Sequence, residues 1–96
     1  MIRHIVLFRW SPEAAAADIE AAIERLSRFG MSNPGCVDFK VADNIGGNPA
    51  NFDCAVIADF PSRSAYESYA NDPAHRHVIR LNDPVVVGKA AIQIEA

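Results

Sequence analysis

The 96-residue sequence predicts an α+β domain in which helices cover one face of a single antiparallel sheet. Four segments have the β-branched, aromatic or alternating composition of strands, and two have apolar residues at every third or fourth position, as amphipathic helices do. Their order is strand, helix, strand, strand, helix, strand. Half of the residues are apolar, which suffices for one core, and no repeat, low-complexity tract or linker appears. We therefore expect a single domain over residues 1–96.

Residues 2–10, IRHIVLFRW, have the composition of a strand. Both faces of this strand are apolar in the middle, with Val6 and Phe8 on one and Ile5 and Leu7 on the other. A strand with one face in water would alternate between apolar and polar residues. Something must therefore cover each face of the sheet at this strand.

The next segment predicts an amphipathic helix of about four to five turns. Ser11 is the expected N-cap, with Pro12 in the first helical position, and Gly30 is the expected end. The apolar stripe of this helix consists of Ala15, Ile19, Ala22, Ile23, Leu26 and Phe29.

Two strands follow, over residues 37–41 and 52–60. The loop at residues 44–51 separates them, because its three Asn, two Gly and one Pro are typical of turns. The second helical region begins with Ser62 as N-cap. It restarts at Asp72 and Pro73, an N-cap followed by a first-turn proline, and ends at residues 82–84.

Residues 89–95 alternate as a last strand, whereas residues 85–88 fit either a connection or the beginning of that strand. This order of elements is the ferredoxin-like βαββαβ arrangement, a four-stranded antiparallel sheet with the first and third strands in the middle. Right-handed crossovers place both helices on one face. The other face needs a second copy of the chain or a ligand, and we expect both, with a two-fold homodimer formed through the sheet face.

Charge and composition exclude several classes of protein. The net charge is −3 and no basic stripe is visible, which disfavours binding to nucleic acid. The apolar run at the start of the chain is short and contains Arg3, His4 and Arg9, so we expect no membrane span or signal peptide and a cytoplasmic location. Cys36 and Cys54 have no metal-type or redox spacing, so we expect two reduced thiols.

The residues around the helix start at Asp72 form the candidate site. His75 falls at the third helical position, where unpaired N–H groups and the positive end of the helix dipole favour a neutral imidazole that can accept a proton. An ordinary exposed residue at a helix start is the alternative. His77 is expected at the surface. His4 and Asp72 could join His75 as metal ligands, but no strong ligand motif is present, and we expect neither metal nor cofactor.

The same residues carry a resemblance to a known family. HIVLFR at 4–9, the segment 53–60 before a helix, Tyr69 six residues ahead of His75, and DPAH at 72–75 together resemble the stress-responsive A/B barrel domain, or Dabb, family. The match extends over essentially the whole chain in the same order. It implies a dimeric α/β barrel made of two ferredoxin-like halves, with a pocket between sheet and helices in each half.

Most members of that family have no established activity, but one is a plant polyketide cyclase that makes olivetolic acid. By similarity to that enzyme, His75 corresponds to a general base, Tyr69 to the residue that orients it, and His4 to a pocket residue on the first strand. The resemblance places five further lining positions at Val6, Phe8, Ile23, Phe39 and Val56.

Gln93 is the sixth expected lining residue. It stands on the last strand where the family often has an Asp, and this loss of a carboxylate favours binding over catalysis. The first hypothesis is a binder of, or enzyme acting on, a small hydrophobic carbonyl compound; a cofactor-free cyclase-like enzyme would use His75 as base. The second is a non-catalytic, stress-associated structural dimer. In that case His4 is a core histidine bonded to the backbone, and Tyr69 is a packing residue.

Overall fold

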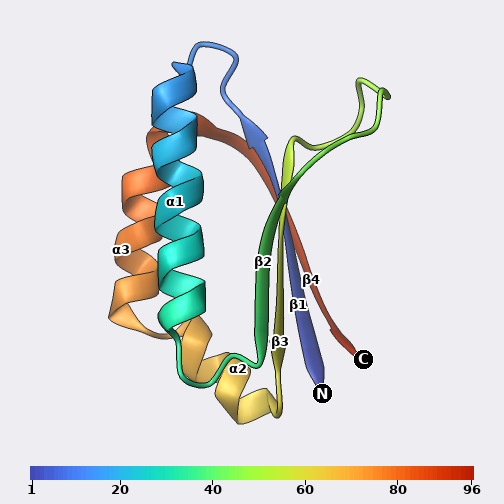
Figure 1. The fold of residues 1–96 in the computed structure, drawn as a ribbon, viewed down its shortest axis with the longest axis vertical. Coiled ribbons are helices and arrows are strands. Elements are labelled where there is room, and N and C mark those ends of the chain that lie inside the picture. Colours follow the sequence, from blue (N-terminus) through green and yellow to red (C-terminus); the bar gives the residue numbers. More distant parts are fainter.

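The computed structural model describes residues 1–96 (Figure 1). The helices and strands are β1 (Ile2–Trp10), α1 (Ala16–Ser32), β2 (Asp38–Asp43), β3 (Cys54–Phe60), α2 (Arg63–Ala70), α3 (Pro73–Asn82) and β4 (Val86–Glu95), with a 3₁₀ turn at Asp83–Val85 before β4.

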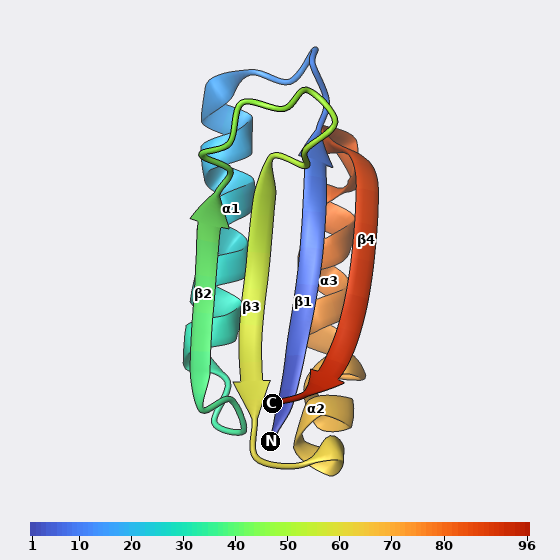
Figure 2. The same ribbon diagram turned by 90° about the vertical axis from the view of Figure 1, so that its right-hand side faces the viewer.

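The four strands form one antiparallel sheet in the order β2-β3-β1-β4. All three helices lie on one face of this sheet, and the other face is uncovered (Figures 1 and 2). Behind the sheet, α1 lies on the side of β2, whereas α2 and α3 lie on the side of β1 and β4 (Figure 2). The predicted ferredoxin-like fold, with the first and third strands in the centre, is confirmed.

The covered face of the sheet holds the core. On β1, His4, Val6 and Phe8 are buried, and the residues between them are only half-buried. Val6 pairs with Val56 on β3, and this strand buries every second side chain as well. Leu26 of α1 packs onto this floor. Burial of these apolar side chains stabilises the monomer.

The predicted ends of the first helix are wrong. Ser11 does not cap it, because the Ser11 backbone N–H donates to the Val85 carbonyl at 2.7 Å and the chain turns before the helix begins at Ala16. Gly30 does not end it either. It is buried inside α1, and a Cβ there would lie 2.1 Å from the Phe39 ring. Gly30 is therefore explained by close packing against β2.

The other predicted caps are confirmed. The Ser62 side chain accepts a hydrogen bond from the Ala65 N–H, and the Asp72 carboxylate accepts one from the Ala74 N–H at 2.9 Å. The predicted strands differ slightly in their bounds, at Asp38–Asp43 and Cys54–Phe60. The segment left open at residues 85–88 is mostly strand, since β4 begins at Val86.

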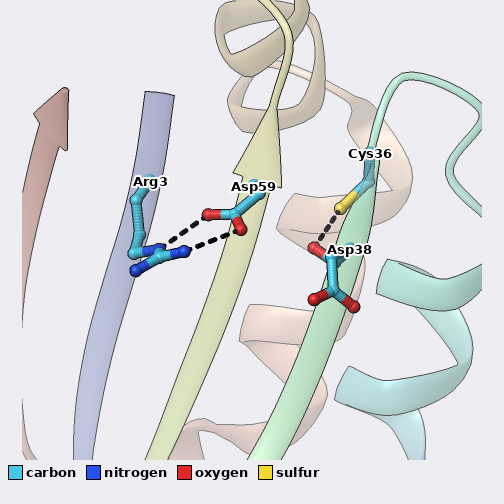
Figure 3. Close-up of polar contacts among 4 residues, drawn as sticks. All are labelled: Arg3, Cys36, Asp38 and Asp59. Atoms are coloured by element: carbon cyan, nitrogen blue, oxygen red, sulfur yellow. Dashed lines mark hydrogen bonds and ion pairs between the residues drawn. The ribbon is translucent and has the colours of Figure 1, made fainter. Parts of the chain in front are cut away.

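The uncovered face, which we call the open face, carries an apolar centre. Ile5 pairs with Ile57 on one side and Ile92 on the other, and Ile92 is 56% exposed. Near one end of this face, Arg3 Nε donates to Asp59 Oδ1 at 2.8 Å and a second bond joins the same side chains at 3.1 Å (Figure 3). The guanidinium of Arg3 lowers the pKa of Asp59. An ion pair thus borders a solvent-exposed apolar surface.

Both cysteines are free thiols. The Cys36 thiol donates to the Asp38 carbonyl at 3.0 Å (Figure 3), and Cys54 is buried beside its register partner Asp43. Burial raises the pKa of Cys54 to about 11, so this thiol is protonated and inert at neutral pH.

Candidate functional site

A cavity of about 190 Å³ lies between the covered face of the sheet and the helices. Its floor is formed by β1, β3 and β4, and its other walls by α1, α2, α3 and the 3₁₀ turn. A larger hollow of about 370 Å³ lies between the 44–53 loop and the sheet, but it contains neither histidine nor tyrosine. The acid–base residues therefore belong to the smaller cavity.

His75 lines the cavity from the first turn of α3. Its Nδ1–H donates to the Ala70 carbonyl at 3.3 Å, which leaves Nε2 with its lone pair available. Burial is the main cause that lowers the pKa of His75, and the Lys89 ammonium lowers it further. The imidazole is therefore neutral at neutral pH and able to accept a proton, as the helix-start position predicts.

His4 lines the same cavity from β1 and has the opposite arrangement of protons. Gln93 Nε2–H donates to His4 Nδ1 at 3.0 Å, so the proton of the neutral ring lies on Nε2. Burial, and secondarily the charge of His75, lowers the pKa of His4 to about 4. His4 thus offers a hydrogen-bond donor where His75 offers an acceptor. The alternative of a backbone-bonded core histidine is wrong for His4, because its partner is the Gln93 side chain.

Tyr69 contacts both histidine rings. Its ring centroid lies 4.8 Å from that of His75 and 5.8 Å from that of His4. The residue is buried and burial raises its pKa, so the phenol keeps its proton. The Tyr69 hydroxyl has no hydrogen-bond partner in the protein. Every fully buried side-chain N or O atom does have such a partner. The hydroxyl is therefore accessible in a residue that lines the cavity.

Four of the six expected lining residues reach the cavity, namely Val6, Phe8, Val56 and Gln93. Ile23 and Phe39 do not line it. Phe39 lies on β2 and packs against Gly30, and Ile23 is a half-buried residue of α1. Both belong to the side of the sheet that α1 covers, whereas the cavity lies toward β4.

The sequence prediction missed four polar residues of the cavity wall, namely Tyr66, Asn82, Asp83 and Lys89. The Tyr66 ring lies 5.1 Å from His4, and its position three residues before Tyr69 on one helix was a usable signal. Asn82 is buried, donates to the Ala22 carbonyl at 3.2 Å and accepts from Arg25 at 3.0 Å. Lys89 lines the cavity because the pairing of β4 with β1 places it opposite Phe8, and local sequence does not show this register.

The remaining candidates lie outside this site. His77 is exposed, as predicted. No group of three or more His, Cys, Asp or Glu side chains is arranged to hold a metal ion. None of the helices combines the length and the apolar character that a membrane crossing requires.

A four-stranded ferredoxin-like sheet with a cavity beneath its helices defines the class of this protein. Within that class, the model of the Stress Responsive A/B Barrel Domain, Dabb, matches residues 2–95. The chain therefore belongs to the Dabb family. No curated protein matches it.

Solved structures share the fold. A dimeric ferredoxin-like protein of unknown function from Thermobifida fusca is 28% identical, with 99% of this chain and 90% of that chain covered and a TM-score of 0.87. A Dabb family protein from Mesorhizobium loti is 19% identical, with 99% and 95% covered and a TM-score of 0.86. A hydroxynitrile lyase from Passiflora edulis is 16% identical, with 97% and 90% covered and a TM-score of 0.85.

Proposed function

We propose that this protein binds a small hydrophobic carbonyl compound in the cavity and can exchange a proton with it. The observation that carries this proposal is the complementary state of the two neutral imidazoles. His75 presents a free lone pair and His4 an N–H donor in the same cavity. An acceptor and a donor in one cavity match a carbonyl compound, which has an acidic C–H beside an oxygen acceptor.

The chemistry needs no cofactor. His75 Nε2 removes a proton from the carbon next to the carbonyl, and the electron pair of that C–H bond moves onto the carbonyl oxygen. Tyr69 O–H or His4 Nε2–H donates a hydrogen bond to the developing oxyanion, which lowers the barrier. Val6, Phe8 and Val56 contact the apolar part of the ligand, as their place in the cavity wall supports.

The assembly we propose is a homodimer that packs open face against open face. Ile5, Ile57 and Ile92 form an exposed apolar patch there, and such patches are usually covered in a soluble protein. The neighbour from Thermobifida fusca and two others are described as dimeric. We also place the protein in the cytoplasm, because both of its cysteines are free thiols.

Hydrogen–deuterium exchange of heptane-3,5-dione in D₂O tests the proton transfer, with loss of the central CH₂ signal followed by NMR. We expect the protein to accelerate exchange and His75→Ala to abolish the acceleration. His77→Ala is the matched control, because that side chain is exposed two positions away on the same helix. If both variants exchange at the wild-type rate, His75 is not the base and the proposal fails.

Tyr69→Phe separates a functional hydroxyl from a packing role. Because this hydroxyl has no partner in the protein, we expect the free energy of unfolding to change by less than about 0.5 kcal/mol. Exchange and dione affinity should fall about 5- to 10-fold, the effect of one hydrogen bond of about 1 kcal/mol. Equal loss of stability and binding would assign Tyr69 to packing and favour the second candidate, a non-catalytic dimer.

A further inference from the structure

Lys89 is an exposed residue of the edge strand β4 that also lines the cavity. Lys89 pairs with Phe8 in the β1–β4 register, so its side chain projects from the covered face of the sheet, on the side of the helices. Its ammonium lies 5.6 Å from the centroid of the Phe8 ring, within the range of a cation–π contact, and Lys89 lines the cavity. The contact keeps the charge at the cavity wall.

The charge of Lys89 is not neutralised by the protein. The ion pairs of the structure join Arg3 with Asp59 and Arg28 with Glu24, and neither involves Lys89. Asp83 also lines the cavity but makes no ion pair with Lys89. Lys89 is exposed, so its ammonium stands at the solvent-facing rim of the cavity, where it is free to pair with an anionic group of a ligand.

The Lys89 charge acts inside the site, since the ammonium is one of the groups that lower the pKa of His75. The Asp72 carboxylate has the opposite effect on that pKa. Lys89 and His75 line the same cavity, so one ligand can reach the ammonium and the proposed base together.

The alternation of β4 supports a specific role for this lysine. Its open-face positions are Ala90, Ile92 and Ile94, all apolar, while Lys89 and Gln93 occupy the covered face. Gln93 holds His4, and Lys89 is the charged residue of β4 that lines the cavity without an ion pair.

We infer that the ligand of this cavity carries a carboxylate that pairs with Lys89, while its apolar body lies over Phe8 and its reactive end lies between His4 and His75. The inference rests on the proposed function, which it narrows to carboxylated carbonyl compounds. The cavity volume of about 190 Å³ is below the ~300–1,000 Å³ of sites for drug-sized molecules, so the ligand is a small acid.

Two probes of equal shape test the inference, trans-cinnamate with a carboxylate and cinnamamide with a neutral amide. Their affinities are measured by titration in ¹H–¹⁵N NMR. We expect the wild-type chain to bind cinnamate at least tenfold more tightly than cinnamamide, and the advantage to shrink as salt is added. Lys89→Met, which keeps the length of the side chain, should lower the affinity for cinnamate to about that for cinnamamide.

Lys40→Met is the matched control, because Lys40 is the only other lysine and lies exposed on β2. It should preserve the preference for cinnamate. In the Lys89→Met variant the pKa of His75 should also rise, since the ammonium that lowers it is gone.

The outcomes separate this inference from the proposed function. If wild-type and Lys89→Met chains show the same ratio of affinities, or if the cation cinnamylamine binds more tightly than either probe, the carboxylate subsite is overturned. In that case cinnamamide still shifts the signals of His4 and His75. If no probe shifts those signals, the proposed binding site itself is wrong.

Discussion

The two faces of the sheet are both apolar at their centres, yet the polar side chains that interrupt them differ. On the covered face, His4 and Gln93 are hydrogen-bonded to each other beside a cavity. On the open face, the polar pair is Arg3 with Asp59, an ion pair near one end of the face, and the exposed isoleucine Ile92 lies on the edge strand. Both pairs lie toward the same end of the sheet, because Arg3 and His4 are neighbours on β1, and Lys40 is the register partner of Ile57 on the open face. The faces therefore differ in the kind of polar group, a neutral hydrogen-bonded pair on the covered face and charged side chains on the open face.

This difference matches two different occupants. A small ligand needs a few placed polar groups within an apolar enclosure, whereas a protein partner needs an apolar centre with a polar rim. The strand β4 takes part in both, because its apolar positions face the open side and its polar positions face the cavity. The loop between β2 and β3 also projects on the open side (Figure 1), where it borders the larger hollow.

The largest expected effect is on the open face. Ile92→Glu places a carboxylate in the proposed dimer interface, where desolvation of the charge without a partner is costly. We expect the dissociation constant of the dimer to rise about 100-fold or more, measured by analytical ultracentrifugation. Leu81→Glu is the control, because Leu81 is an exposed apolar residue of α3 on the helical side, and it should leave the dimer unchanged.

A wild-type chain that sediments as a monomer at all concentrations would break the comparison, since the open face would then have no protein occupant. Dissociation by Leu81→Glu with no effect of Ile92→Glu would move the interface to the helical side.

Features set by neighbouring residues could be predicted from the sequence. The strand composition of residues 2–10, the caps at Ser62 and Asp72, and the position of His75 at a helix start all depend on local pattern. The ends of α1 could not. Gly30 is a helix-ending residue by local rules, but the contact that explains it is with Phe39 on another strand.

The residues of the site also include some that could be predicted from the sequence and some that could not. The resemblance to the Dabb family supplied Tyr69 and His4, but the bond between His4 and Gln93 depends on how β1 and β4 pair, 89 residues apart in sequence. The resemblance also placed Ile23 and Phe39 in the pocket, but it does not show that α1 covers the β2 side of the sheet while the cavity lies toward β4.

The covered face is tightly packed toward β2 and hollow toward β4, and Gly30→Ala tests the tight part. The new Cβ would overlap the Phe39 ring, so we expect a loss of about 2 to 3 kcal/mol in the free energy of unfolding, from denaturant titration. Gly47→Ala is the control, because nothing lies within 4 Å of a Cβ there, and it should be neutral or slightly stabilising. Phe39→Leu in the Gly30→Ala chain should restore part of the loss. An unchanged stability of Gly30→Ala would show that the covered face is not tightly packed toward β2.

The smallest expected effect is the pH dependence of the free energy of unfolding that arises from the histidines of the cavity. The pKa of His4 is lowered to about 4, below its ordinary value of 6.5, so the unfolded chain binds more protons between these two values. The stabilisation from the neutral ring is full above pH 6.5 and is lost as the pH falls toward 4. We expect a loss of about 1 to 2 kcal/mol, after allowing for solvent that reaches the ring, and the lowered pKa of His75 acts in the same direction.

Gln93→Glu should raise the pKa of His4. A carboxylate can only accept, so Nδ1 must carry a proton, and the negative charge favours the imidazolium. The pKa of His4 should rise, its ¹⁵N spectrum should show Nδ1 protonated, and the loss of stability toward pH 4 should become smaller. Gln93→Met, which neither donates nor accepts, should keep the pKa low while the ring is no longer fixed in one tautomer. If Gln93→Glu leaves the ¹⁵N spectrum of His4 unchanged, Gln93 does not control this ring, and the complementary proton arrangement of the two histidines would have to come from another group.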